Sequence, residues 1–439
     1  MVASIAVAVA GARQMARHRD ADGTDPVTST GGVAFVWLFA AQTGVLTLGL
    51  ILPEVAADFG VSTAVAGQLR TLAGLVGGIA ALAVVLFGER IGLRKLLLVG
   101  NGLLALGASA SAAAPSLFTL AAAQVAVGAA TGLLISGGLA AAASWTPPKR
   151  RAKALAWASL GQPASWVAGM PLIGMTADLG WRYAWLGVPL AAAGAGLAAV
   201  RSRPREVREN ATGSRAYPLR WDAKLVGWTI GELLSYAGWG GALVYAGALL
   251  LESYDASAGT VGLVLGGAAI AAFPGNFLAR RWLSGYSREL LAVLGILAAS
   301  IAAVFGTVRP GLGVSSAIFT LLVLVACTRT VAGNAFALYV TPQRRLAVMG
   351  VRASTVQLGY LLGAGLGGAA LASGGYTLLG ATLATLFALG AAPHLAAVLA
   401  ARAALDAPRA TRSMNLGWHP RARIRSTRRP DPVRATCGA

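Results

Sequence analysis

The chain has 439 residues, of which 56% are hydrophobic and only 12% are charged, and its mean hydropathy is +0.67. Soluble globular proteins carry about 25% charged residues, so this composition excludes an ordinary soluble domain and indicates a protein solvated by lipid. The net charge of +20 does not indicate a nucleic-acid-binding protein, because the basic residues stand in short groups between apolar runs.

Twelve apolar runs follow one another, each close to or above the ~20 residues that a helix needs to cross a bilayer. The first six cover residues 33–52, 64–86, 93–113, 117–143, 154–177 and 181–200. The last six cover residues 225–250, 258–282, 289–308, 313–340, 348–372 and 376–401. The polar segment 201–224 between them, with Pro, Gly and many charges, reads as a cytoplasmic linker.

This pattern predicts an all-α membrane protein with twelve transmembrane helices in two pseudo-symmetric six-helix halves, residues 33–200 and 225–401. A tail at residues 1–32 and a basic tail at 402–439, expected to be disordered, flank them. All Lys and Arg residues except Arg70, Arg182, Arg309 and Arg329 fall on the side that holds both tails and the linker. Because Lys and Arg mark cytoplasmic loops, both termini are predicted to be cytoplasmic, in a bacterial-type inner membrane.

The two halves carry a weak internal repeat. A displacement of 194 residues superimposes "PKRR" (148–151) on "PQRR" (342–345) and Arg94 on Arg288. Such symmetry is typical of a transporter whose substrate site lies between the halves, near the bilayer midplane.

This architecture resembles the major facilitator superfamily over almost all of residues 33–401, which implies the major facilitator fold. The segment "GERIGLRK" (88–95) resembles the family's loop between helices 2 and 3: Glu89 stands for an Asp, Arg90 and Gly92 match, and Arg94 continues the basic run. In the family this loop contacts the neighbouring half and helps to gate it, which is the role implied for these residues. The alternative is an ordinary basic loop with one solvated acid.

The segment "GMPLIGMTADLGWRYAW" (169–185) resembles the fifth-helix motif of twelve-span drug:proton antiporters, particularly sugar- and chloramphenicol-efflux-like permeases. Gly169 and Gly174 permit close helix approach and Pro171 lacks a backbone donor, so a bend is expected. The resemblance implies export; a packing kink with no bearing on direction is the alternative. The family's fourth-helix Arg, often tied to proton coupling, falls at Gln124, which cannot supply a fixed charge.

Glu232 is the one carboxylate well inside an apolar run. Carboxylates at membrane depth are costly and usually face the bundle interior or a water-filled cavity. One helix face holds Glu232 with aromatic and hydroxyl side chains, as in a small-molecule pocket: Trp228, Ser235, Tyr236 and Trp239. We therefore predict that Glu232 lines the cavity and carries the proton, with an interhelical polar clamp as the alternative.

Further cavity candidates are the polar and aromatic residues inside the matching runs: Gln42, Arg70, Gln124, Gln162, Trp166, Gln357 and Tyr360. Each could instead form an interhelical hydrogen bond, because such polar residues commonly hold membrane helices together. Arg70 also lies within reach of the membrane surface.

Arg329 stands in the apolar stretch "LVLVACTRTVAGNAF" (321–335) without an acidic neighbour in sequence. It lies about 16 Å from the inner end of its run, and Glu232 about 10 Å from the inner end of its own, at 1.5 Å per residue. In the resembled family, these two helices border the central cavity. We therefore predict that Glu232 answers the charge of Arg329; the alternative is that backbone carbonyls and water hold Arg329.

These features predict a secondary transporter that exports a small drug- or sugar-like molecule by alternating access, coupled to proton entry. Two alternatives remain: a facilitator or symporter that imports a small anionic metabolite, and a non-transporting membrane scaffold or sensor. No nucleophile–base pair, phosphate loop or metal-ligand spacing appears, so neither an enzyme nor a cofactor or metal is expected. The expected partners are the lipid bilayer, a small-molecule substrate and the proton, with no nucleic acid, and the protein is expected to be a monomer.

Overall fold

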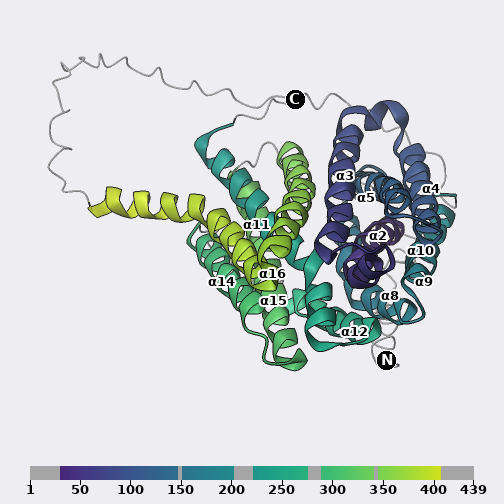
Figure 1. Ribbon diagram of the computed structural model, residues 1–439. Coiled ribbons are helices and arrows are strands. Elements are labelled where there is room, and N and C mark those ends of the chain that lie inside the picture. The colour runs from purple at the N-terminus through teal and green to yellow at the C-terminus, as the bar shows by residue number, and fades with distance from the viewer. Residues whose placement is uncertain (1–29, 147–150, 202–220, 275–287, 341–344, 407–439) are drawn as a thin grey trace, which may run out of the picture. The chain divides into compact units, whose positions relative to one another are not determined.

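The computed structural model describes residues 30–146, 151–201, 221–274, 288–340 and 345–406 (Figure 1). Every regular element among these residues is helical. The first half contains α2 (Thr30–Asp58), α3 (Thr63–Ile91), α4 (Leu93–Ala112), α5 (Leu117–Ser144), α6 (Arg151–Ser159), α7 (Gly161–Ala164), η2 (Ser165–Gly169), α8 (Met170–Ala177), α9 (Trp181–Leu186) and α10 (Val188–Arg201). The second half contains α11 (Ala223–Tyr254), α12 (Ala258–Ala269), α14 (Arg288–Thr307), α15 (Leu312–Val340) and α16 (Arg345–Asp406).

These elements follow the predicted apolar runs, and the architecture is the predicted one, twelve transmembrane helices in two halves. The elements α6 to α8 form the fifth helix, and α9 with α10 the sixth. The long α16 supplies the last two, because non-helical backbone at Gly374 and Gly375 divides it. Gly375 has a φ of 61°, which a glycine adopts without strain. Residues 275–282, the end of the predicted eighth run, lie outside the described residues.

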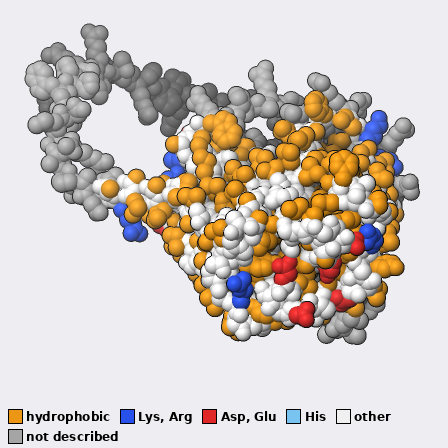
Figure 2. All heavy atoms as spheres, viewed as in Figure 1, with side chains coloured by type: hydrophobic (Ala, Val, Ile, Leu, Met, Phe, Trp, Pro, Cys, Tyr) orange, Lys and Arg blue, Asp and Glu red, His pale blue; other side chains and the backbone are white. Residues whose placement is uncertain are grey.

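The surface agrees with a lipid environment. Among the described residues, nine helical segments are long and apolar enough to cross a membrane. Figure 2 shows one face of the molecule covered mostly by hydrophobic side chains. Large apolar side chains such as Ile79, Leu106 and Val293 are exposed where a soluble protein would carry polar groups. Lipid tails are the solvent that suits this surface.

Glycines bring the two halves into close contact. We call the end of each helix that lies on the same side as Arg201 and Ala223 the linker end, and the opposite end the far end. Between α2 and α11, a Cβ added at Gly247 would lie 2.5 Å from the carbonyl oxygen of Gly49. Between α3 and α16, a Cβ at Gly74 would lie 3.2 Å from the nearest backbone nitrogen of α16. The halves therefore meet backbone to backbone, which membrane helices achieve with small residues.

The fifth-helix motif lies at a third contact between the halves, where α8 packs beside α12 (Figure 1). A Cβ at Gly174 would collide with the carbonyl oxygen of Ala258, and one at Gly266 would lie 2.7 Å from the ring of Pro171. Gly169 has more room, since its nearest neighbour would be 3.7 Å away.

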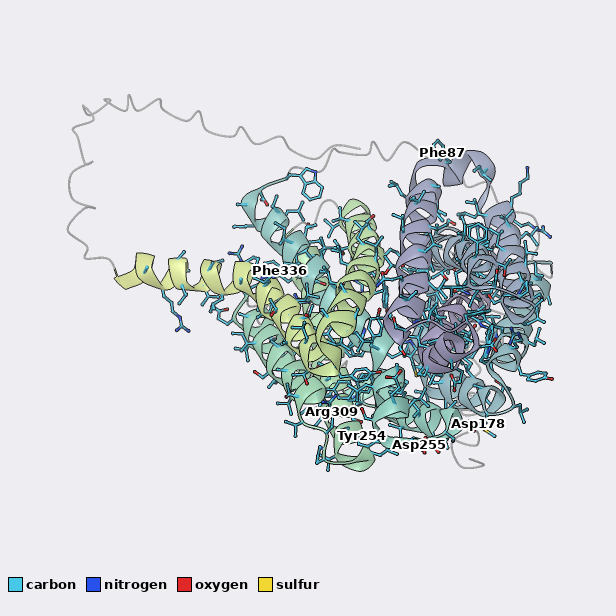
Figure 3. All side chains as sticks on the ribbon, viewed as in Figure 1. Phe87, Asp178, Tyr254, Asp255, Arg309 and Phe336 are labelled. Atoms are coloured by element: carbon cyan, nitrogen blue, oxygen red, sulfur yellow. The ribbon has the colours of Figure 1, made fainter. Side chains whose placement is uncertain are left out.

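Where a bend is expected in this helix, the structure has a π-helical turn. In η2, the Met170 amide donates to the carbonyl of Ser165, five residues back. The turn immediately precedes Pro171, which has no N–H to continue the α-helical ladder. At the far end, the Asp178 carboxylate accepts a hydrogen bond of 2.9 Å from the amide of Gly259 and so joins the halves again (Figure 3).

Candidate functional site

Helix α11 positions most of the candidate residues of the second half. It begins at a cap in which the Asp222 carboxylate accepts a 2.8 Å hydrogen bond from the Leu225 amide. The five residues predicted to share one face of this helix are all buried: Trp228, Glu232, Ser235, Tyr236 and Trp239. Their neighbours come from α15, from both legs of α16 and, through Trp239, from η2 of the first half.

Glu232 and Arg329 form a buried ion pair between α11 and α15. Arg329 Nη1 lies 2.9 Å from Glu232 Oε1, and the exposed fractions of the two side chains are 2% and 0%. Arg329 Nη2 also donates to the carbonyl of Gly231 at 3.1 Å. The predicted pairing is confirmed: one guanidinium nitrogen binds the carboxylate and another binds a backbone carbonyl of the same helix.

The ion pair fits because α15 presents a glycine to it. A Cβ at Gly333 would collide with Glu232 Oε1, so any larger residue there would displace the carboxylate. The indole of Trp228 donates to the carbonyl of Gly333 at 3.0 Å, which fixes α15 against α11 one turn from Arg329. Glu232 Oε2 and Arg329 Nε have no hydrogen-bond partner among the described residues. Glu232 thus keeps one oxygen that can take up a proton or accept a hydrogen bond, and Arg329 keeps one N–H that can donate.

A second polar link, which sequence reasoning missed, joins α11, α15 and α16. Arg352 donates from Nη2 to the hydroxyl of Tyr236 at 2.8 Å and from Nε to the side-chain oxygen of Asn334. Its guanidinium also lies 5.8 Å from the centre of the Tyr236 ring. Arg352 lies inside the predicted run 348–372, close to its first residue, and the sequence analysis groups it with the charges of the cytoplasmic loops. Its position inside an apolar run is the sequence feature that could have indicated a buried contact.

Aromatic rings connect the two halves beside this site. Trp166 of η2 and Trp239 of α11 have ring centres 5.6 Å apart, and Trp239 stacks on Phe319 of α15 at 6.4 Å. Rings at these separations attract one another through dispersion and their quadrupoles. The predicted cavity residues Trp166 and Trp239, which come from opposite halves, are therefore in direct contact.

Four further candidates form a second group: Arg70 of α3 and three residues near it. Its guanidinium lies 5.1 Å from the centre of the Tyr360 ring of α16, while its Nε and Nη2 have no partner among the described residues. Nearby in the fold, Gln162 Nε2 of α7 donates to Gln42 Oε1 of α2 at 3.3 Å. Gln42 also interacts with Tyr360, which connects the two pairs. Arg70 is 3% exposed and has no ion-pair partner among the described residues, so its charge is unanswered there.

Two candidates lie elsewhere. Gln124 of α5 donates to the hydroxyl of Ser111 in α4 at 3.0 Å, a contact inside the first half. Gln357 of α16 lies against Gly77 and Gly78 of α3, at the interface between the halves. The structure does not bring Gln124 to either group described above.

The loop between α3 and α4 is described only in part. The side chains of Glu89 and Arg90 lie outside the described residues, so their gating role stays a prediction. Gly92 precedes α4 with a φ of 86°, a conformation that favours glycine, and Arg94 lies in the first turn of that helix.

Comparisons with known proteins agree with this fold. The family model described as Major Facilitator Superfamily matches residues 34–230 and 228–433. No curated protein sequence matches the chain. Among solved structures, the chain is similar to a D-xylose–proton symporter, with 15% identity, a TM-score of 0.66, and 83% of this chain and 96% of that chain covered. For the xylose transporter XylE from E. coli in an inward-open conformation, the identity is 14%, the TM-score 0.64 and the coverage 83% and 94%.

A bacterial homologue of the human lysosomal transporter Spinster, inward-facing and unoccupied, is also similar, with 15% identity, a TM-score of 0.60, and 87% and 96% covered. At these identities the solved structures establish the fold alone. Membrane helices in two halves, together with a family model that matches both halves, define the class of the protein as a membrane transporter. The chain belongs to the major facilitator superfamily.

Proposed function

We propose that the protein carries a small anionic organic solute together with a proton across the cytoplasmic membrane by alternating access. The observation that carries this proposal is the buried ion pair between Glu232 and Arg329. A buried pair is held by mutual compensation, so neutralising one partner leaves the other as an uncompensated charge.

The pair provides a direct coupling of proton and anion. When a proton binds Glu232, the carboxylate loses its charge and no longer compensates Arg329. A carboxylate or phosphate on the solute then supplies the missing negative charge, because a guanidinium binds such groups with two parallel hydrogen bonds. Each ligand favours binding of the other, and by linkage this preference is reciprocal. Favourable joint binding supports symport, and a proton gradient directed inward would drive uptake.

Arg70 supports an acidic solute independently of the ion pair. Its charge has no carboxylate partner among the described residues, and two of its nitrogens lack hydrogen bonds there. An anionic group between Arg70 and Tyr360 would supply both the missing negative charge and hydrogen-bond acceptors for the two nitrogens. The amides of Gln42 and Gln162 would then bind neutral polar groups of the solute, since Gln42 Nε2 is also without a partner in the described part of the chain.

The contacts between the halves support alternating access. The glycine contacts and the Asp178 hydrogen bond lie between the middle of the helices and the far end. Such an arrangement suits a state closed at the far end and reached from the linker end, with the halves rocking about the site between them. With both termini in the cytoplasm, the far end is periplasmic.

Export of a drug- or sugar-like molecule against proton entry is the second candidate. The resemblance of residues 169–185 to the motif of exporters favours it. In that mechanism the substrate and the proton would compete for Glu232, which suits a cationic or neutral solute and leaves the charge of Arg70 without a role.

The sign of solute-induced proton movement distinguishes the two. Purified protein in liposomes that contain a pH-sensitive dye would be given a panel of small organic acids, sugars and cationic drugs. For symport, an added acid acidifies the liposome interior; for antiport, an added drug or sugar makes it alkaline. Glu232→Gln should abolish the signal, whereas Glu289→Gln, which changes an exposed acid of the same half, should preserve it. An unchanged signal in Glu232→Gln would refute the proton assignment.

A further inference from the structure

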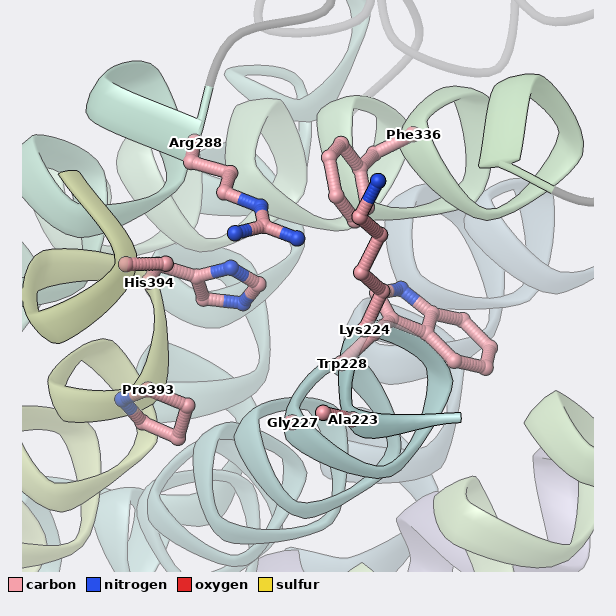
Figure 4. Close-up of a pocket in the computed structure, with 9 residues that line it drawn as sticks. Ala223, Lys224, Gly227, Trp228, Arg288, Phe336, Pro393 and His394 are labelled. Carbon is pink, nitrogen blue, oxygen red and sulfur yellow. The ribbon is translucent and has the colours of Figure 1, made fainter. Parts of the chain in front are cut away.

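A pocket unrelated to the interface between the halves lies at the linker end of the second half (Figure 4). It has a volume of about 150 Å³, well above the ~30 Å³ that a water molecule occupies in the liquid. It is formed by the beginnings of α11 and α14, the end of α15 and the second leg of α16. Six residues give it its character: Lys224, Trp228, Arg288, Phe336, Pro393 and His394.

The charged side chains of this pocket are all basic. Figure 4 shows Arg288 and His394 on one side of the space, both extending into it, with Lys224 on the other side. The Arg288 guanidinium lies 5.6 Å from the centre of the Phe336 ring, which is within the range of a cation–π contact. No carboxylate is among the described residues that line the pocket.

The acids nearest in sequence do not neutralise these charges from inside the pocket. Asp222 accepts the hydrogen bond that caps α11, and neither it nor the exposed Glu289 lines the pocket. The cations therefore surround a half-enclosed space that favours a negative ligand.

His394 adds an independent indication of a ligand. Its side chain is 2% exposed, and its Nε2 has no hydrogen-bond partner among the described residues. The ring lies edge-on to Phe336, with centres 5.9 Å apart, and Nε2 faces α11 at Gly231. Buried polar atoms are nearly always hydrogen-bonded, so this unpartnered imidazole nitrogen leaves one hydrogen-bonding position open where His394 lines the pocket.

The internal repeat shows that this cluster is not simply a shared feature of both halves. The displacement of 194 residues that matches Arg288 with Arg94 places Val200 at the position of His394 and Thr30 at that of Lys224. The first half thus has a counterpart of Arg288 but none of Lys224 or His394. Arg94 also supplies a matched control for Arg288.

We propose that this pocket binds a phosphate group. A phosphate offers several acceptor oxygens, which is what an arginine fork, a lysine and an imidazole N–H require together. The pocket lies at the helix ends that the basic loops mark as cytoplasmic, where basic pockets between helices bind the headgroups of anionic lipids. The phosphate comes either from such a headgroup or from a soluble phosphate.

Binding to the purified full-length protein in a neutral detergent tests the proposal with three probes. They are dioctanoyl phosphatidylglycerol, dioctanoylglycerol as the same chains without phosphate, and inorganic phosphate. Native mass spectrometry or a thermal shift measures each affinity. We expect phosphatidylglycerol to bind and dioctanoylglycerol not to bind; binding of inorganic phosphate as well would assign the site to soluble phosphates.

Arg288→Gln and Lys224→Gln should each weaken phosphatidylglycerol binding by at least about tenfold, the effect of losing about 1.4 kcal/mol. Lys224 is exposed, so its replacement does not endanger folding. Arg94→Gln removes the charge that corresponds to Arg288 in the first half, and Lys95→Gln removes a lysine charge at the same helix start; both should change the affinity less than twofold. Equal losses in all four variants, or equal binding of dioctanoylglycerol, would overturn the proposal.

Discussion

A double-mutant cycle across the Glu232–Arg329 pair measures how strongly the two charges depend on each other. We would compare Arg329→Met, Glu232→Leu and the double variant, in which apolar side chains of similar size replace the charged ones. Each single variant leaves a nearly fully buried charge without its partner 2.9 Å away. Breaking a buried pair in this way costs about 3–5 kcal/mol, whereas replacing both charges by apolar groups is often close to neutral.

The expected numbers follow from that difference. Independent losses would sum to roughly 6–10 kcal/mol in the double variant. We expect the double variant to lose less than either single variant, so the coupling energy should amount to several kcal/mol. The control is the pair Arg182–Asp58, with an N–O distance of 2.8 Å but side chains 41% and 40% exposed. Exposed pairs couple by only about 0–1 kcal/mol, so Arg182→Gln and Asp58→Asn should be nearly additive.

The free energies of unfolding are measured in mixed micelles. A denaturing detergent is titrated into each purified variant, and tryptophan fluorescence follows the unfolding. Folded yield after extraction gives a second readout for variants too unstable to titrate. If the losses of the buried pair add within about 0.5 kcal/mol, the two charges do not compensate each other, and the coupling mechanism proposed for them fails.

Three further predictions concern packing, substrate and topology. Gly333→Ala should destabilise the protein by roughly 1–3 kcal/mol in the same titration, because its Cβ would collide with the carboxylate of the ion pair. Gly267→Ala, where no atom lies within 4 Å of the added Cβ, should change stability by less than about 1 kcal/mol, and equal effects would contradict the packing argument. Arg70→Met should raise the KM for an anionic solute by at least about tenfold, and an unchanged KM would exclude Arg70 from the site. In a background without native cysteines, an impermeant maleimide should label Gly311→Cys but not Ser214→Cys from outside intact cells; the reverse pattern would invert the predicted orientation.

The ion pair was predictable from sequence because depth along a straight helix follows from residue number. Helix α15 ends at Val340, as its apolar run does, and α11 begins two residues before its run. The fixed rise per residue then placed Glu232 and Arg329 at depths that their side chains could bridge. The sparse charge helped as well, since few other buried partners were available.

Rotation about the helix axis was not predictable in the same way. Gln124 and Gln162 are both amides inside apolar runs, yet one bonds within its own half and the other faces Gln42. Which neighbour each amide meets depends on helix packing, which the apolar pattern of a lipid-solvated helix hardly encodes, because both faces are hydrophobic. The same reason hid the Arg352 contacts and the pocket at His394, whose lining comes from four separate helices.

The distribution of charge between the halves separates proton binding from the rocking movement. The displacement of 194 residues that relates the halves places Leu38 at the position of Glu232 and Ile135 at that of Arg329, so the pair exists in the second half alone. Because α11 and α15 belong to the same half, a rigid movement of one half against the other leaves the pair intact, and only a proton or a solute changes it.

The variant Glu232→Gln tests this separation. Its amide oxygen can still accept from Arg329, but it cannot take up a proton, so pH-driven accumulation of the solute should be lost. Exchange of labelled for unlabelled solute at equal pH requires only rocking and should continue at a rate within about threefold of the wild type, since a threefold change corresponds to less than 1 kcal/mol in the barrier. Both activities would be measured in the same liposome preparation. If exchange disappears together with pH-driven uptake, the carboxylate is needed for the movement itself, and proton binding and rocking are not separate steps.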